Sequence, residues 1–307
     1  MIKTEHLSKR YKSLTAVDDV SFQVGPGEVL GFLGPNGAGK TTTMRMLAGF
    51  VDPTAGTASI CGHDIQTDPL RAKASLGYLP EGAPSYGEMT VRAFLDFIAD
   101  LRQLDGARRQ SRLDHVIGRL QLEKVLEQTV ETLSKGFRRR VGLAQAMLSD
   151  PPVLILDEPT DGLDPNQKQE VRTLINEMAR DKIIVISTHI LEEVDAVCTR
   201  AIIIARGRIV ADDTPTALAA KSRYHNAVSL QLETPDQLAE ARTAVAALPT
   251  VAGVEVSERD GRLTALPRAG ATILPAISEL AARQGLRLKE LHLESGRLDE
   301  VFRTITA

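Results

Sequence analysis

The pattern of apolar and polar positions changes along the chain and divides it into segments of different structure. Residues 2–24 alternate, which predicts antiparallel strands at the edge of a sheet. After Leu30, short apolar runs at 153–156, 183–187 and 201–205 are interleaved with helical segments. Short apolar runs of this kind are typical of buried parallel strands. We therefore expect an α/β core with a mainly parallel sheet and an antiparallel β subdomain.

Residues 83–149 carry no strand signal. Apolar side chains there recur at helical spacing, at positions 91, 94, 95, 97 and 98 and again at 113, 116, 117 and 120. This spacing predicts a helical insert within a core domain that spans residues 1–215. The stretch 213–222, with Pro215 and several alanines, is the expected boundary with a second unit.

The pattern beyond residue 222 predicts a small α+β domain over residues 222–307. Strand and helix signals follow one another in the order β-α-β-β-α-β, at 228–233, 235–248, 254–257, 262–266, 271–283 and 286–293, and a closing helix follows at 298–305. This order is the split arrangement of ferredoxin-like domains. Because no catalytic set of residues stands out there, we favour a structural or dimer-supporting role over ligand sensing.

Composition limits the class of protein. At 307 residues, two domains are expected, and 43% hydrophobic residues suffice for packed cores. A net charge of −3 argues against a nucleic-acid partner. The longest apolar runs are far shorter than the ~20 residues that a membrane-spanning helix needs, and the N-terminal residues show no signal segment, so a cytoplasmic protein is expected.

One glycine-rich stretch carries the strongest chemical signal. It matches the phosphate-binding loop G-x-x-x-x-G-K-[ST], between an apolar strand at 28–33 and a helix that opens at 43–48. Glycines let backbone N–H groups surround phosphates, a lysine adds a point charge, and the threonine after it is a Mg²⁺ ligand. The expected ligands of a nucleoside triphosphate are Gly34, Pro35, Asn36, Gly37, Ala38, Gly39, Lys40, Thr41 and Thr42.

Two carboxylates end the apolar run at 153–156. Since sites assemble at the carboxyl ends of parallel strands, Asp157 is expected to hold Mg²⁺, and Glu158, which points differently, to polarise the attacking water. The alternative interpretation is an acidic strand-to-loop turn capped by Pro159. The presence of the phosphate loop in the same chain favours the catalytic interpretation over this one.

With these motifs in order, residues 1 to about 215 resemble the ATP-binding subunit of an ABC transporter. The segment Leu133-Ser134-Lys135-Gly136-Phe137 stands where that family has its signature L-S-G-G-Q. The resemblance implies that Ser134 and Gly136 bind the γ-phosphate of ATP held by a second subunit, in a homodimer that encloses two ATP molecules. Lys135 and Phe137 depart from the family pattern.

The resemblance assigns four more positions. Asp164 in the segment 161–164 corresponds to the acidic residue of the D-loop, and His189 to the switch histidine that contacts the γ-phosphate and holds Glu158. Tyr11 stands where an aromatic stacks on adenine, a surface tyrosine being the alternative. Glu81 replaces the usual glutamine of the Q-loop and remains a candidate to face Mg²⁺ or its water.

The resemblance implies an ATPase that works with ATP and Mg²⁺ on the inner face of the cell membrane. The altered signature, Glu81 and the added domain are similar to exporter-type subunits, such as those of gliding-motility, copper-maturation and drug-export systems, which pair with a separate membrane permease. A soluble ATPase acting on ribosomes or DNA is the alternative, although such proteins usually carry two nucleotide domains or long coiled-coil arms. A non-hydrolysing, nucleotide-gated scaffold is a weaker third possibility.

Overall fold

The computed structural model describes residues 1–83, 86–257 and 260–306, which divide into two compact units, 1–214 and 215–305. Residues 84–85 of the predicted insert, and residues 258–259 and 307 of the predicted second domain, lie outside the described residues. Among those described, no helix combines the length and apolarity needed to cross a bilayer.

A six-stranded sheet forms the centre of the first unit. Its order is β10-β9-β3-β8-β7-β6, and every neighbouring pair is parallel except β10 with β9. All residues of β3, β7 and β8 are buried, which explains the uninterrupted apolar runs 153–156 of β7 and 183–186 of β8. The strands are β3 (Val29–Leu33), β6 (Leu76–Leu79), β7 (Val153–Asp157), β8 (Ile183–Thr188), β9 (Arg200–Ala205) and β10 (Arg208–Asp213).

A second, antiparallel sheet has the order β2-β1-β4-β5 and contains the alternating N-terminal segment. Its strands are β1 (Ile2–Tyr11), β2 (Leu14–Val24), β4 (Ala55–Ile60) and β5 (His63–Asp64). Helix α1 (Lys40–Leu47) contacts strands of both sheets, so their apolar faces share one core. The phosphate loop, which leads into α1, is therefore held by both sheets.

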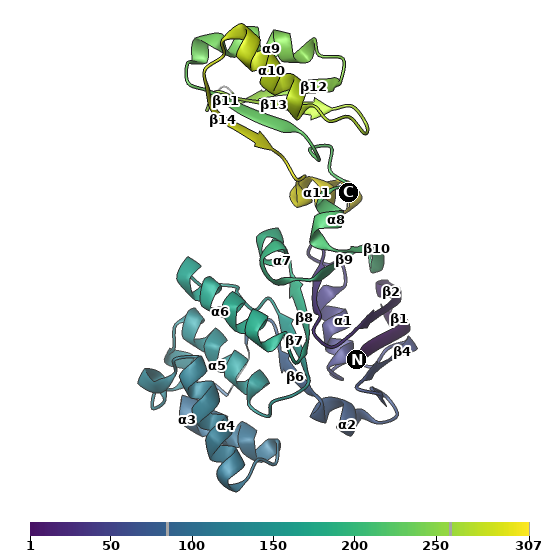
Figure 1. The fold of residues 1–307 in the computed structure, drawn as a ribbon. Coiled ribbons are helices and arrows are strands. Elements are labelled where there is room, and N and C mark those ends of the chain that lie inside the picture. Colours follow the sequence, from purple (N-terminus) through teal and green to yellow (C-terminus); the bar gives the residue numbers. More distant parts are fainter. Residues whose placement is uncertain (84–85, 258–259, 307) are drawn as a thin grey trace. The chain divides into compact units, whose positions relative to one another are not determined.

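Helices α3, α4, α5 and α6 gather on one side of the six-stranded sheet (Figure 1). Their apolar faces form a core with β7 and β8, to which Phe94, Val116 and Leu143 contribute. The helices are α2 (Pro69–Ala74), α3 (Val91–Leu101), α4 (Gly106–Arg119), α5 (Lys135–Met147), α6 (Pro165–Met178) and α7 (Leu191–Val197), with 3₁₀ turns at Glu123–Val125 and Val130–Thr132. Within the described part of the predicted insert, strand pairing is limited to an isolated bridge between Thr90 and Thr129.

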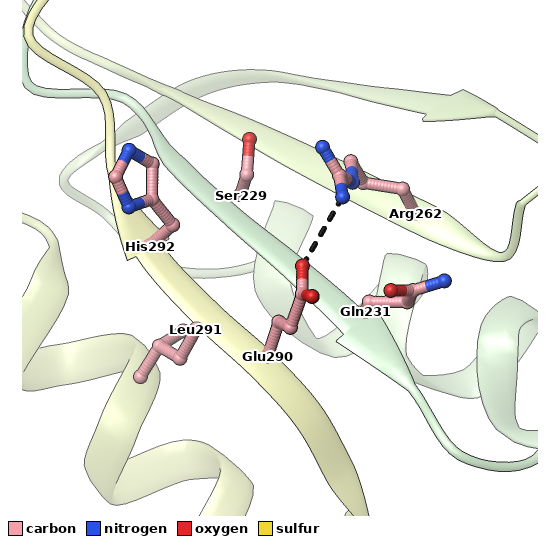
Figure 2. A pocket seen from close by; sticks show the side chains of 6 residues that line it. All are labelled: Ser229, Gln231, Arg262, Glu290, Leu291 and His292. Carbon is pink, nitrogen blue, oxygen red and sulfur yellow. Dashed lines mark hydrogen bonds and ion pairs between the residues drawn. The ribbon is translucent and has the colours of Figure 1, made fainter.

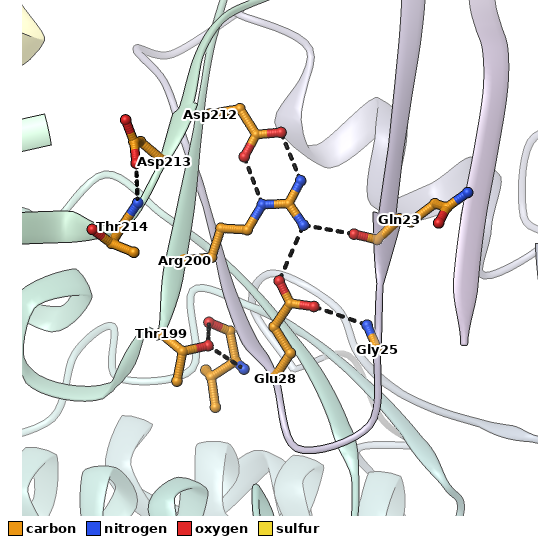
Figure 3. A network of polar contacts seen from close by, with 9 residues as sticks. Gln23, Gly25, Glu28, Thr199, Arg200, Asp212, Asp213 and Thr214 are labelled. Atoms are coloured by element: carbon orange, nitrogen blue, oxygen red, sulfur yellow. Dashed lines mark hydrogen bonds and ion pairs between the residues drawn. The ribbon is translucent and has the colours of Figure 1, made fainter. Parts of the chain in front are cut away.

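A network around Arg200 ties β9 to its neighbours. The guanidinium group bonds both carboxylate oxygens of Asp212 at 2.6 Å, the Glu28 carboxylate at 3.1 Å and the Gln23 carbonyl at 2.8 Å (Figure 3). These hydrogen bonds, opposed by partial burial, raise the pKa of Arg200. The network joins strands of both sheets on the edge that carries the loop between β2 and β3.

The second unit has a four-stranded antiparallel sheet in the order β12-β13-β11-β14. Helices α9 and α10 cover one face of it (Figure 1). The elements are α8 (Pro215–Ala219), β11 (Val228–Leu232), a 3₁₀ turn (Pro235–Gln237), α9 (Leu238–Ala246), β12 (Val251–Ser257), β13 (Arg262–Pro267), α10 (Leu274–Gln284), β14 (Leu288–Leu293) and α11 (Leu298–Thr306). The predicted fold class is confirmed.

Two predicted element boundaries in the second unit were wrong by three residues. Strand β12 begins at Val251, three residues before the prediction. Helix α10 begins at Leu274, not at 271, because Pro275 favours the first turn, and it ends where Gly285 adopts a left-handed conformation with φ of 65°.

The sheet face opposite α9 and α10 carries a shallow pocket of about 280 Å³ (Figure 2). Arg262 and Glu290 form an ion pair of 3.2 Å across it. The pocket is lined by Ser229, Gln231, Arg262, Glu290, Leu291 and His292.

Candidate functional site

The glycine-rich loop joins the buried end of β3 to helix α1. Gly37 and Gly39 have φ of 78° and 107°, the left-handed region in which side chains are disfavoured. A Cβ at Gly34 would lie 2.4 Å from the Ile204 carbonyl oxygen, and one at Gly39 equally close to that of Ala16. Helix α1 begins at Lys40, three residues earlier than predicted. The N–H groups of residues 40–42 thus lie in its first turn, where they are free for an anion.

Lys40 is only 7% exposed, and its ammonium group folds back on the loop. Nζ donates hydrogen bonds to the carbonyl oxygens of Gly34 at 2.7 Å and Pro35 at 3.3 Å. Burial lowers the pKa of Lys40, and the charges of Glu158 and Asp157 oppose this shift. The lysine is therefore a buried cation beside the acidic end of β7.

The Asp157 carboxylate lies at the end of β7 and is 1% exposed. Among the described residues, its Oδ2 atom has no hydrogen-bond partner. Burial raises its pKa, and the charges of Glu81 and Glu158 raise it further, while the hydroxyl group of Thr41 lowers it. An orphaned, buried carboxylate oxygen near a hydroxyl and a second carboxylate suits a hard cation such as Mg²⁺.

Glu158 and His189 meet above the ends of β7 and β8. The His189 Nδ1 atom lies 2.8 Å from the Glu158 Oε1 atom. Glu158 has φ of 52°, a strained conformation for a residue with a side chain, and its N–H donates to the Ser187 carbonyl at 2.8 Å. The Glu158 carboxylate bonds His189 and Thr188, whereas the Asp157 Oδ2 atom has no hydrogen-bond partner among the described residues. The two adjacent carboxylates therefore have separate surroundings.

Arg139 links the signature helix α5 to the acidic strand ends. The residue is 3% exposed, and its guanidinium donates to the carbonyl oxygens of Pro80 at 3.1 Å and Asp157 at 2.9 Å. Burial lowers the pKa of Arg139, whereas nearby carboxylates, Glu81 among them, raise it. Glu81 itself is exposed and lies next to Pro80. Arg139 therefore places a positive charge beside the carboxylate that replaces the usual glutamine.

The signature and D-loop residues lie at the starts of two neighbouring helices. Ser134 caps α5, where its Oγ accepts a hydrogen bond of 3.3 Å from the Phe137 N–H, and Asp164 caps α6 through the Gln167 N–H at 2.9 Å. A Cβ at Gly136 would lie 2.7 Å from the Gln167 side chain. The Gln167 side chain on α6 therefore lies directly against the backbone of Gly136 at the start of α5.

The structure does not bring all predicted residues together within one chain. Over the described residues, no hydrogen bond or ion pair connects Tyr11, Ser134 or Asp164 with Lys40 or Asp157. Tyr11 ends β1 and is 45% exposed, with the Lys9 ammonium 5.2 Å from its ring centre. Phe137, which departs from the signature sequence of the family, packs against the helical core. The Arg140 guanidinium lies 5.7 Å from its ring.

Sequence reasoning missed three residues that the structure places at the site. Arg139 lies under the carboxylates, and Thr188 and Glu193 lie behind Glu158. Arg139 stands between Arg138 and Arg140, and Glu193 follows Glu192, so the sequence does not distinguish the charges at the site from their like-charged neighbours. Burial of a charge requires partners, which the sequence alone does not reveal.

Comparisons with known proteins agree with this geometry. Residues 17–161 match the family model "ABC transporter". The chain is 40% identical over 220 residues to the Nod factor export ATP-binding protein I of Paraburkholderia xenovorans, covering 71% of this chain and 72% of that protein. It is 32% identical over 309 residues to the daunorubicin resistance ATP-binding protein DrrA2 of Streptomyces coeruleorubidus, covering 99% and 94%.

A solved structure described as the ATP-binding subunit of an ABC transporter superimposes with a TM-score of 0.68. It shares 31% sequence identity and covers 72% of this chain and 92% of its own. The chain belongs to the family of ABC transporter ATP-binding subunits. It is an ATPase.

Proposed function

We propose that this chain binds Mg²⁺-ATP between two copies of itself and uses hydrolysis to drive a separate membrane permease, for export. The observation that carries the proposal is the division of the site. Lys40, Asp157, Glu158 and His189 lie together, while Ser134 starts a different helix without contact to them among the described residues. A second copy supplies the missing half.

The chemistry follows from the positions of the chain's own side chains. Lys40 exchanges its bonds to the loop carbonyls for the outer phosphates, and the N–H groups of the loop bind the inner ones. Glu158 accepts a proton from the attacking water, and His189 fixes the orientation of that carboxylate. Thr41, Asp157 and Glu81 would hold Mg²⁺, which neutralises charge on the phosphate oxygens.

The second half of each ATP site is assigned to the partner copy. The start of α5 is exposed and carries no acidic residue in its first turn, so its N–H groups and the Ser134 hydroxyl suit a γ-phosphate. Asp164 starts the adjacent helix and would connect the two sites of the dimer. Tyr11, exposed at the end of β1, is assigned to the adenine ring.

Subunit mixing tests the shared site. Lys40→Ala damages one half of the site and Ser134→Arg the other, so each variant alone is expected to be inactive. In a mixture, heterodimers contain one site with both halves intact, and ATP turnover is expected to reappear. The control is each variant taken through the same mixing procedure with a second preparation of itself. Mixtures that stay inactive, although each variant is folded and associates, would contradict a site built from two chains.

The permease partner and the membrane location are supported by family membership, and export by the name of the Nod factor export relative. The Q-loop region beside Glu81 and the helices α3 to α5 are the surface assigned to the permease. The second unit, residues 215–305, is assigned an accessory role that supports the dimer.

Purification from detergent-solubilised membranes tests this assignment. The tagged chain is expected to retain a polytopic membrane protein, and the amount retained should respond to ATP, because the dimer opens and closes on the permease. A tagged, unrelated soluble protein gives the background. Recovery with ribosomes or DNA in place of a membrane protein would overturn the proposed transport role and leave the ATPase assignment intact.

A further inference from the structure

The hydroxyl group of Thr188 lies between two carboxyl groups at the end of β8. Its oxygen is 3.0 Å from the Oε2 atom of Glu193 and 3.4 Å from the Oε2 atom of Glu158. It also accepts a hydrogen bond of 3.1 Å from the N–H of Ile190. Glu158 contacts His189 through its other oxygen, so its two oxygens have different partners.

A single hydroxyl has one proton, so Thr188 donates to only one of the two carboxyl groups. If Glu193 is ionised, the shorter distance directs that proton to Glu193, and the Glu158 oxygen receives nothing from Thr188. If Glu193 carries a proton, it donates to Thr188, and Thr188 is free to donate to Glu158. The protonation of Glu193 thus decides whether Glu158 is held from one side or from two.

The surroundings of Glu193 favour the neutral acid. The residue is 2% exposed, and its Oε1 atom has no hydrogen-bond partner among the described residues. No lysine, arginine or histidine nitrogen in the described part of the chain lies within ion-pair distance of it. An ionised carboxylate with one bare oxygen is costly to bury, whereas a carbonyl oxygen in the same place costs far less.

The titratable and charged groups that face Glu193 agree with this assignment. They are Glu158 at the end of β7, Lys168 and Arg172 on α6, and the thiol of Cys198 after α7. Burial raises the pKa of Glu193, and the charge of Glu158 raises it further. The hydrogen bond with Thr188 and the two α6 cations, which form no ion pair with Glu193 among the described residues, oppose the shift. Burial raises the pKa of Cys198 to about 12, which leaves that thiol neutral.

We propose that Glu193 is a protonated positioning residue, which donates to Thr188 so that the Thr188 hydroxyl donates to Glu158. The inference rests on the proposed role of Glu158 as the base that activates water. In this arrangement Thr188 accepts from Glu193 and Ile190 and donates to Glu158, which satisfies both lone pairs and its proton. No proton leaves Glu193 during turnover. Its function is to fix the free oxygen of Glu158 while His189 fixes the other.

Carbon-13 NMR of labelled glutamate side chains tests the protonation state directly in the full chain. The Glu193 carboxyl signal is identified by its disappearance in Glu193→Gln. We expect this signal to stay at the protonated position as the pH rises through the ordinary pKa of 4.5 to neutral. Titration of Glu193 below neutral pH would overturn the inference, because Glu193 would then be ionised during turnover.

Kinetics test whether the positioning affects catalysis. Thr188→Val keeps the bulk of the side chain and removes the hydroxyl, and we expect kcat to fall about threefold to tenfold with KM nearly unchanged, the loss of one hydrogen bond to the base. Glu193→Gln keeps a neutral donor to Thr188 and should keep kcat close to the native value. Adding Glu193→Leu to Thr188→Val should not increase the loss, because Glu193 acts on Glu158 only through the Thr188 hydroxyl.

The outcomes separate this inference from the proposed function. An unchanged kcat in folded Thr188→Val, a large loss in Glu193→Gln, or a further loss in the double variant would overturn the link through Thr188. None of these results bears on Glu158 itself, whose role is decided by its own substitution.

Discussion

Replacement of Glu158 by glutamine is expected to lower kcat for ATP hydrolysis by about 10²-fold to 10⁴-fold, the contribution of a positioned general base. Glutamine preserves the size of the side chain and can keep the contact with His189, which is 2.8 Å long in the native chain. Only the ability to take a proton from water is lost. A phosphate-release assay at saturating ATP measures the effect.

ATP binding should survive this substitution, because the Glu158 side chain bonds His189 and Thr188 and makes no hydrogen bond or ion pair with the phosphate loop among the described residues. The variant is therefore expected to accumulate as an ATP-bound dimer, which size-exclusion chromatography with and without ATP detects. Glu192→Gln, an exposed neighbour of Glu193 on α7, is the matched control and should hydrolyse ATP at the native rate. Native turnover in Glu158→Gln would show that another group activates the water.

Lys40→Ala is expected to weaken ATP binding by about tenfold to a hundredfold, because charge-assisted hydrogen bonds contribute roughly 1.5–3 kcal/mol. The loop geometry gives the reason. Nζ is buried and lies within 3.3 Å of two loop carbonyls, so it is already in the position from which it reaches a phosphate. Titration with a fluorescent ATP analogue measures the dissociation constant.

The control for this prediction is Lys124→Ala, which removes an exposed lysine from a 3₁₀ turn of the helical insert. It should bind ATP as tightly as the native chain. The substitution leaves the carbonyl oxygens of Gly34 and Pro35 without their donor. Circular dichroism is therefore used to check that Lys40→Ala is folded. Native affinity in a folded Lys40→Ala variant would show that the lysine does not contact the nucleotide.

Much of the core could be predicted from sequence because buried parallel strands leave a simple pattern. The runs at 153–156 and 183–186 are apolar throughout since both faces of β7 and β8 are covered. Parallel strands also end at the same edge, which places Asp157 and Glu158 of β7 near His189 after β8. Local patterns sufficed for these residues.

Other features depend on contacts between distant segments and were therefore not predictable. Arg139 bonds carbonyls that are 59 and 18 residues away, and no local spacing signals such a contact. The strand β6 is short and contains a glycine, so its four residues give a weak signal. The start of α1 at Lys40 depends on the left-handed conformation of Gly39, which the surrounding backbone imposes.

The narrow fit of Gly34 and Gly39 against the neighbouring carbonyls has a consequence for the energetics of nucleotide capture. Because the backbone of the second sheet and of β9 confines the loop from two sides, its conformation is largely set before ATP arrives. Association then involves little loss of backbone entropy. Any substitution that loosens this confinement, even one far from the phosphates, should make ATP binding more enthalpically driven and entropically unfavourable.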